Sequence, residues 1–400
     1  MLTLPRRSPT ILLFLALFNS ILGLSLLFPI LGPLGRQLGL DEVHIGWLNS
    51  AYSLMQLLAS PWWGKRSERV GRRPVLLTGI FGFAVGFGAF GAVAWLGTQG
   101  LLRGYALFFA LLCCRILTGA LSAATMPTAQ AYIADITPRE RRTSGMAMVG
   151  AAFGLGVVFG PALGAGLAHF GLLVPIFVSA SVALINGVFV LSSLPEPTRH
   201  ETHVGVTTRS SFALTWPLLV IAFGATLSVV SLEQTAAFLF QDVLKLTAQD
   251  AARHVGMALA LYGVAAVISQ GGIARRVRVA PIRLLLVSLP ETVLGLTCVA
   301  LANRFVTLTG AMMLLGLGTG LTMPALAAAL SLEVGDDKQG EVAGLNSSAQ
   351  ALGRTLGPLV GTALYSAHHR TPYWGGAALA LVLWLVLALH RARPSPTHAP

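Results

Sequence analysis

The sequence predicts an all-α membrane protein with twelve transmembrane helices, arranged as two six-helix bundles related by a pseudo-twofold axis along the membrane normal. Hydrophobic residues fill 54% of the 400 positions and charged residues only 10%, which is too little charge to cover a soluble globule of this length. Apolar runs of about 20 residues recur along the chain, and such runs form helices in lipid because each peptide group must be satisfied within its own segment. Short motifs also occur twice in the same order, which predicts two related halves.

Twelve runs are long enough to cross a bilayer, and a long polar interval follows the sixth. The predicted helices are 11–33, 43–64, 74–96, 104–131, 142–168, 172–194, 216–240, 254–273, 283–301, 305–330, 342–366 and 373–390. The polar interval is typical of a linker between the halves. The expected parts are an N-terminal bundle, a cytoplasmic linker, a C-terminal bundle and a cytoplasmic tail, at 1–194, 195–215, 216–391 and 392–400.

The formal charge of +12 predicts membrane topology rather than a nucleic-acid partner, because the basic residues lie in short joints between the apolar runs. Of the 27 lysines and arginines, 19 lie at the N-terminus, in the even-numbered joints or in the C-terminal tail, and only six lie in the opposite joints. The positive-inside rule therefore places both termini in the cytoplasm. We expect a multi-pass monomer surrounded by lipid, in a bacterial plasma (inner) membrane.

Repeated motifs support two halves of the same orientation. Met126-Pro127 recurs as Met323-Pro324, and the glycines of the fifth run recur in the eleventh run, at one offset of 197 residues. Earlier in each half, Tyr52 recurs as Tyr262 at an offset of 210. Six helices in each half give both halves the same orientation, which is a parallel repeat. Transport folds of this kind bind their substrate between the halves, near the middle of the membrane.

The joint between the second and third predicted helices has an acid and several arginines between glycines. Two glycines permit a tight turn that holds an acid against guanidinium groups and a helix N-terminus; alternatively, the arginines only set topology. This joint resembles the signature loop of the major facilitator superfamily, with Glu68 where that family usually has Asp. The resemblance implies a cytoplasmic gate loop formed by Gly64, Glu68, Arg69, Gly71, Arg72 and Arg73.

The fifth predicted helix is rich in glycine. Gly156, Gly160, Pro161 and Gly164 resemble the core of a motif from the drug:proton antiporter branch of the same superfamily, which contains the tetracycline and multidrug exporters. Glycines four residues apart let two helices approach closely, and a proline bends the helix. Ordinary helix packing is the alternative interpretation of the same residues.

The fourth predicted helix contains an intramembrane arginine. A bare cation at this depth costs about 2.5–3.5 kcal/mol on insertion scales, so Arg115 is expected to face the interior and to have a partner. Together with Thr118 and Gly119 it resembles a third superfamily element, which implies a role for Arg115 in proton coupling. The alternative is that Arg115 snorkels to the membrane interface.

Three other charges lie inside predicted spans, at Glu233, Glu291 and Arg354. In the architecture that the resemblance implies, helices one, four, seven and ten line the cavity, which ranks Glu233 above Glu291. A desolvated carboxyl takes up a proton more readily, so Glu233 is the expected coupling acid, unless it is only solvated at the outer mouth. Other polar residues expected in the substrate cavity are Asn19, Tyr52, Gln56, Gln234, Asn346, Gln350 and Arg354.

The resulting hypothesis is proton-coupled efflux of small amphipathic compounds by alternating access, because an apolar cavity with few charges suits lipophilic ligands. The alternatives are transport of one metabolite, such as an organic anion or a sugar, and a non-transporting membrane sensor on the same fold. No nucleotide loop, nucleophile-base set or metal-ligand spacing is present in the sequence, so we expect no enzyme activity, no metal and no cofactor beyond a proton gradient.

Overall fold

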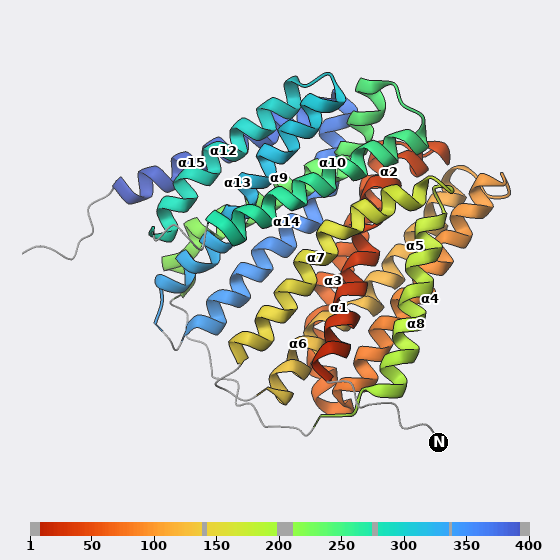
Figure 1. The fold of residues 1–400 in the computed structure, drawn as a ribbon, viewed down its shortest axis with the longest axis horizontal. Helices are drawn as coiled ribbons and strands as arrows, with labels where there is room; N and C mark the ends of the chain where they lie inside the picture. The colour runs from red at the N-terminus through yellow and green to blue at the C-terminus, as the bar shows by residue number, and fades with distance from the viewer. Residues whose placement is uncertain (1–8, 138–141, 198–210, 274–278, 336–337, 393–400) are drawn as a thin grey trace, which may run out of the picture. The chain divides into compact units, whose positions relative to one another are not determined.

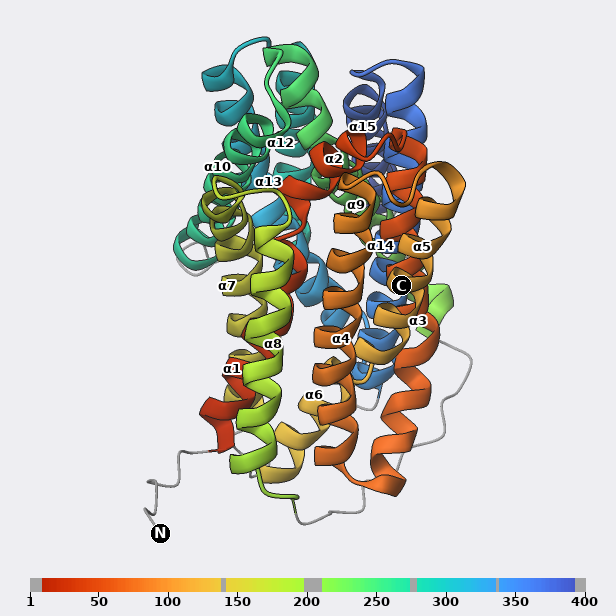
Figure 2. The same ribbon diagram turned by 90° about the vertical axis from the view of Figure 1, so that its right-hand side faces the viewer.

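The structure, a computed structural model, describes residues 9–137, 142–197, 211–273, 279–335 and 338–392, and these residues are almost entirely helical (Figures 1 and 2). Within these ranges, each of the twelve predicted spans contains helix, which confirms the all-α membrane fold. The ranges contain α1 (Pro9–Ser25), α2 (Phe28–Gln37), α3 (Glu42–Val70), α4 (Arg72–Thr98), α5 (Gly104–Ser122), α6 (Thr125–Ile136), α7 (Arg142–Ala168), α8 (Val174–Ser193), α9 (Ser211–Leu244), α10 (Ala248–Ile268), the π-helix η2 (Ser269–Ile273), α12 (Pro281–Leu301), α13 (Phe305–Leu332), α14 (Gln339–Ala367) and α15 (Thr371–Ala392).

Ten spans in the described residues are long and apolar enough to cross a membrane. The two long helices outside that set are α3 and α14, each of 29 residues. Both carry polar side chains along their length, including Gln56 in α3 and Asn346, Gln350 and Arg354 in α14. Polar residues inside a membrane protein usually face its interior or a wet cavity, so a substrate site is expected along these two helices.

Two predicted helices, 11–33 and 104–131, are broken in the structure. The first is divided into α1 and α2 just before Pro29, and the fourth into α5 and α6 just before Pro127. Proline lacks a backbone N–H, so it cannot bond the carbonyl four residues earlier. The second half differs, because Pro324, the counterpart of Pro127, lies inside the continuous helix α13.

The second predicted helix is longer than its apolar run, because both of its ends are capped. The Asp41 side chain accepts a hydrogen bond of 2.7 Å from the backbone N–H of His44, which starts α3. At the other end α3 continues past residue 64 to Val70 and ends at Gly71, whose φ of +118° suits glycine.

The chain divides into two compact units by contacts. Unit 1 consists of Met1–Val204 and Ala236–Ala260. Within it, α1 packs against α7 and α8, α4 against α5 and α8, and α3 against α5 (Figure 1). Its core contains Leu13, Ala16, Leu17, Leu76, Ile80, Ala129, Tyr132, Ile133, Val149, Ala152, Val190 and Leu194.

Unit 2 consists of Gly205–Thr235 and Leu261–Pro400. Within it, α12 packs against α13 and α15, and α14 packs against α13 and α15. Its core contains Leu218, Leu219, Ile221, Ala222, Leu285, Leu289, Ala325, Leu326, Ala329, Leu330, Val342, Leu383 and Leu387. Most of the predicted linker, at 198–210, and nearly all of the predicted tail, at 393–400, lie outside the described residues.

Candidate functional site

Arg115, on α5, is the largest fully buried side chain in the described residues, with 1% of its surface exposed. Its Nε donates to the backbone oxygen of Leu48 at 3.1 Å, and its Nη2 donates to Oδ1 of Asn49 at 2.5 Å. The guanidinium carbon lies 4.4 Å from the ring centroid of Tyr52 and 5.9 Å from that of Phe90. These contacts place Arg115 inside unit 1, so it does not snorkel to an interface.

The partners of Arg115 are oxygens and ring faces rather than an acid. No ion pair joins Arg115 to a carboxylate in the described residues, and its Nη1 has no hydrogen-bond partner there. Aromatic faces attract a cation more strongly when it is desolvated. The arrangement therefore holds a fixed positive charge in the interior without neutralising it.

Tyr52 also belongs to a second polar group beside Arg115. Its hydroxyl lies 3.1 Å from Oγ of Ser122, and Nε2 of Gln56 donates to the Tyr52 hydroxyl at 2.8 Å and to Ser122 at 3.2 Å. The structure thus brings Tyr52 and Gln56 together, as two of the predicted cavity residues. Ser122 and Asn49 were not predicted, and the recurrence of Ser122 as Thr319 at the 197-residue offset is a signal for the first of them.

In unit 2, Glu233 on α9 interacts electrostatically with Arg354 on α14 and with Tyr262 on α10. No described residue forms a hydrogen bond or an ion pair with the Glu233 carboxyl. On α14, Nε2 of Gln350 donates to Oδ1 of Asn346 at 3.2 Å, one turn before Arg354. Glu233 and the predicted stripe of α14 therefore belong to one unit, and the carboxyl is not locked in a salt bridge.

The remaining predicted cavity residues are less informative. Asn19 on α1 and Gln234 on α9 are both buried, and Glu291 on α12 is partly exposed. Asn19 belongs to unit 1 and Gln234 to unit 2.

The joint between α3 and α4 is built around Arg72 and Arg73. Nε of Arg72 forms an ion pair of 2.9 Å with Oδ2 of Asp135, and its Nη1 donates to Oγ of Ser67 at 2.7 Å. The backbone N–H groups of Arg72 and Arg73 donate to the two carboxylate oxygens of Glu196, at 2.5 and 3.0 Å. An acid at the first turn of α4 complements the positive end of the helix dipole.

Two details of the predicted gate loop are wrong. Gly64 does not form a turn, because α3 continues through it, and only Gly71 turns the chain. The acid at the N-terminus of α4 is Glu196 and not Glu68, because the latter lies on the last turns of α3, is exposed and pairs with no described residue. Arg69, next to it, is exposed as well.

The glycines of α7 form a contact face against α1. A Cβ on Gly156 would lie 3.0 Å from the backbone nitrogen of Leu22, and one on Gly164 would lie 2.6 Å from the backbone oxygen of Leu26. Gly160 meets Ser25 in the same contact, and Pro161 follows it within the helix. These residues therefore pack α7 closely onto α1.

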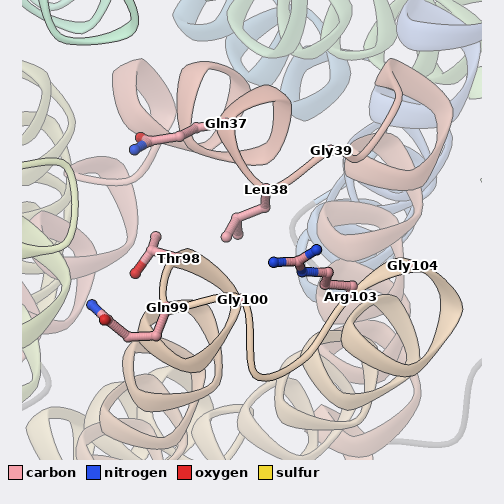
Figure 3. Close-up of a pocket in the computed structure, with 9 residues that line it drawn as sticks. Gln37, Leu38, Gly39, Thr98, Gln99, Gly100, Arg103 and Gly104 are labelled. Atoms are coloured by element: carbon pink, nitrogen blue, oxygen red, sulfur yellow. The ribbon is translucent and has the colours of Figure 1, made fainter.

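Two surface hollows in the described residues lie away from all of these side chains. One, of about 420 Å³, is lined by residues from the end of α2 and the loop between α4 and α5 (Figure 3). Arg103 reaches toward it from the start of α5 and is its one charged residue. The other, of about 560 Å³, borders Gln37, Thr98 and the start of α8. Neither hollow contains a predicted cavity residue, and the described residues contain no group of His, Cys, Asp and Glu placed to hold a metal ion.

The fold and these charged residues define a polytopic α-helical membrane transporter. The chain belongs to the Major Facilitator Superfamily, whose profile matches residues 13–291 and 254–400. Members of this family are transporters and not enzymes.

Several known proteins resemble the chain over nearly its full length. The class C tetracycline resistance protein of Escherichia coli is 31% identical over 92% of this chain and 93% of its own. Multidrug resistance protein 2 of Bacillus subtilis is 28% identical over 91% and 90%. Among solved structures, a bacterial homologue of the human lysosomal transporter Spinster has a TM-score of 0.75 at 13% identity, over 97% of this chain and 98% of its own.

Proposed function

We propose that the protein is a proton-coupled exporter of small amphipathic compounds that works by alternating access. The names of its relatives, tetracycline and multidrug resistance proteins, support the substrate class. The observation that carries the proposal is Glu233, an acid inside a membrane helix that no described residue holds in a hydrogen bond or ion pair. Such a carboxyl is free to take a proton from one side and to release it to the other.

Within unit 2, Arg354 gives this acid an electrostatic setting. When Glu233 is ionised, its charge balances that of Arg354; when it is protonated, the field of Arg354 is no longer balanced. Protonation of Glu233 therefore alters the field on any substrate beside Arg354, which is the coupling that an antiporter needs. Arg115 is the proposed second coupling residue, as a fixed charge in unit 1 that no acid among the described residues neutralises.

Purified protein in proteoliposomes tests this proposal, with tetracycline as the probe and an imposed pH gradient as the driving force. Glu233→Gln is expected to reduce gradient-driven accumulation to the level of empty liposomes, while exchange of labelled for unlabelled tetracycline continues. Glu291→Gln is the matched control, because it makes the same change in a membrane helix outside the site, and it should accumulate substrate normally. Normal accumulation by Glu233→Gln would remove Glu233 from the mechanism.

A second candidate function, transport of an organic anion, is favoured by the exposed side chain of Arg354 beside the amides of Asn346 and Gln350. A related fold, that of a human organic anion transporter, has a TM-score of 0.65. Arg354→Ala, measured in the same liposomes, should then lose anionic substrates while it keeps neutral ones. Equal loss of both classes, with normal amounts of folded protein, would favour a packing role for Arg354.

We also propose that both termini and the linker at 195–215 face the cytoplasm of a bacterial cell, and that the protein acts as a monomer with bundles at 1–194 and 216–391. The distribution of lysine and arginine supports this orientation. Labelling of single engineered cysteines in the joints, with reagents that do not cross the membrane, tests it.

A further inference from the structure

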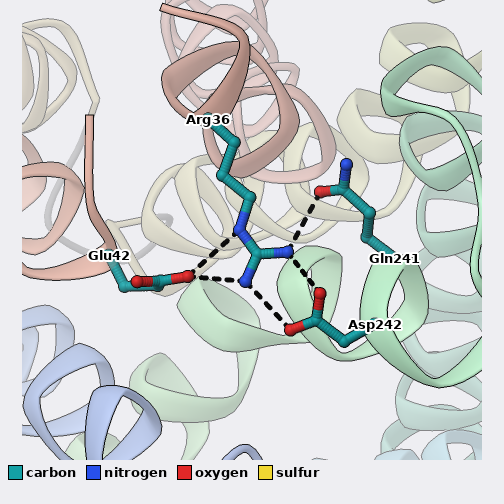
Figure 4. A network of polar contacts seen from close by, with 4 residues as sticks. All are labelled: Arg36, Glu42, Gln241 and Asp242. Atoms are coloured by element: carbon teal, nitrogen blue, oxygen red, sulfur yellow. Dashed lines mark hydrogen bonds and ion pairs between the residues drawn. The ribbon is translucent and has the colours of Figure 1, made fainter. Parts of the chain in front are cut away.

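A charged network lies where α2 meets the end of α9, and no part of the site described above includes it (Figure 4). The guanidinium of Arg36 bridges two carboxylates. Its Nη1 and Nη2 donate to the two oxygens of Asp242 at 2.5 and 2.9 Å, and its Nε and Nη2 donate to Oε1 of Glu42 at 3.1 and 2.5 Å. A longer bond of 3.4 Å joins Nη1 to Oε1 of Gln241. Arg36 and Asp242 are 206 residues apart, in different sequence halves, but both belong to unit 1.

Beneath this network the two helices are in dry contact. Gly32, one turn before Arg36, faces Phe238, one turn before Asp242, and a Cβ on Gly32 would lie 3.1 Å from the Phe238 ring. The same ring is fully buried, and the Arg36 guanidinium carbon lies 4.9 Å from its centroid. The ion pair therefore covers the outer end of a sealed apolar contact.

A second close approach joins the same segment to α7. A Cβ on Gly256 of α10 would lie 2.7 Å from the backbone oxygen of Pro161. The segment Ala236–Ala260, which is the end of α9 and the start of α10, thus packs on both α2 and α7 within unit 1. These contacts join the start of the second sequence half to the first half. They lie near the start of α3, at the opposite end of that helix from the α3–α4 joint.

From this geometry we propose that Arg36, Asp242 and Glu42 form a latch that closes the non-cytoplasmic end of the transporter and opens when substrate is released there. The inference rests on the proposed alternating access. A bidentate arginine with two carboxylates has the geometry of a strong and specific pair. The latch is nevertheless partly exposed, with 23%, 38% and 20% of the three side chains open to solvent, so water replaces its bonds when it opens.

The reporter for the latch is Ala237, which is 1% exposed and lies against Gly32. Cys113, Cys114 and Cys298 are first changed to serine, and Ala237→Cys is then introduced. The rate at which a membrane-impermeant maleimide alkylates this thiol in intact cells measures how often the contact opens to the outside. The measurement needs no substrate, so it stands even where the proposed export fails.

Asp242→Asn and Arg36→Gln each remove the bridging pair and are each expected to raise the alkylation rate by roughly 1.5- to fivefold, the range that the loss of a partly exposed salt bridge gives. The double variant should be no faster than the faster single variant, because both break the same contact. Asp250→Asn, which removes a carboxylate from the start of α10 without touching Arg36, is the matched control and should leave the rate unchanged.

The latch is disproved if both single variants are alkylated at the parent rate, or if Asp250→Asn accelerates the reaction as much as they do. Either variant alone decides the question where the other does not reach the membrane. Alkylation that occurs only in inverted vesicles would instead show that this end faces the cytoplasm, which overturns the latch at the non-cytoplasmic side. Loss of tetracycline transport by the parent protein, with the alkylation pattern intact, would count against the proposed export and not against the latch.

Discussion

Unit 1 and unit 2 each contain a hydrogen bond between a tyrosine hydroxyl and a serine or threonine hydroxyl, but among the described residues only the bond in unit 1 has an arginine beside it. In unit 1 the Tyr52 hydroxyl meets Ser122 at 3.1 Å, and in unit 2 the Tyr262 hydroxyl meets Thr319 at 2.9 Å. The tyrosines are related by the 210-residue offset and the hydroxyl residues by the 197-residue offset. Each contact therefore repeats the other across the duplication.

The backbone beside these hydroxyls is repeated as well. Gly119 in α5 faces the backbone oxygen of Tyr52, and Gly316 in α13 faces the backbone oxygen of Tyr262. Arg115, however, has Met312 as its counterpart at the same offset, and both side chains are 1% exposed. The duplicated contacts thus belong to the scaffold, whereas the charge is present in one copy only, which supports the proposal that Arg115 has a role beyond the fold.

The largest expected effect comes from Arg115→Met, which gives unit 1 the residue that unit 2 already has. Met312 indicates that an unbranched apolar side chain fits this position, so folded protein should reach the membrane. Gradient-driven tetracycline accumulation should nevertheless fall to background, because the fixed charge is gone. Normal tetracycline accumulation by Arg115→Met would contradict this difference between the units. Equal loss of accumulation by Met312→Leu in unit 2 would contradict it as well.

A smaller effect is expected at the paired glycines. A Cβ on Gly119 would lie 2.6 Å from the Tyr52 backbone oxygen, and the equivalent contact at Gly316 is at least as tight. Gly119→Ala and Gly316→Ala should therefore both lower the free energy of unfolding, by about 1–3 kcal/mol, through overpacking. Thermal unfolding in detergent measures this. Equal losses support a shared scaffold; a loss at only one glycine would mean that the two contacts differ in strength.

The smallest effect is expected at the tyrosine hydroxyls. Tyr262→Phe should cost about 0.5–1.5 kcal/mol of stability, the net value of a hydrogen bond, and should slow transport less than Tyr52→Phe does, because it keeps the ring beside Glu233. Tyr52→Phe should cost a similar amount and should also slow transport, because Gln56 loses its acceptor beside Arg115. Initial rates of tetracycline uptake into inverted vesicles distinguish the two. Identical rates for both variants would place the Tyr52 hydroxyl in the scaffold.

The sequence was sufficient to predict that the helices exist, because their apolar runs are long, but it was insufficient to predict where they end. The end of α3 depends on the cap at Gly71, and the start of α4 depends on the carboxylate of Glu196, 124 residues after Arg72; neither contributes to apolar length. The breaks before Pro29 and Pro127 were not predicted either. Pro324, which is the counterpart of Pro127, leaves α13 intact. Proline alone therefore does not decide whether a membrane helix breaks.

The charged residues inside the spans were predictable, because their insertion cost makes them stand out. Their partners were less predictable. Arg115 is held by a backbone oxygen, an amide and two ring faces, and none of these has a distinct sequence pattern. Arg36 and Asp242 lie 206 positions apart, and a single sequence does not show that two such distant residues are paired.

The carboxylate of Glu196 at the start of α4 has a consequence for biogenesis. A ribosome adds roughly 5–20 residues per second, so Arg72 leaves it about 6–25 s before Glu196, which follows 124 residues later. The first turn of α4 consequently waits for its cap until the sixth span has been synthesised. Nascent chains released before Glu196 would carry an uncapped helix, so this contact marks the point at which the first half of the transporter is complete during translation.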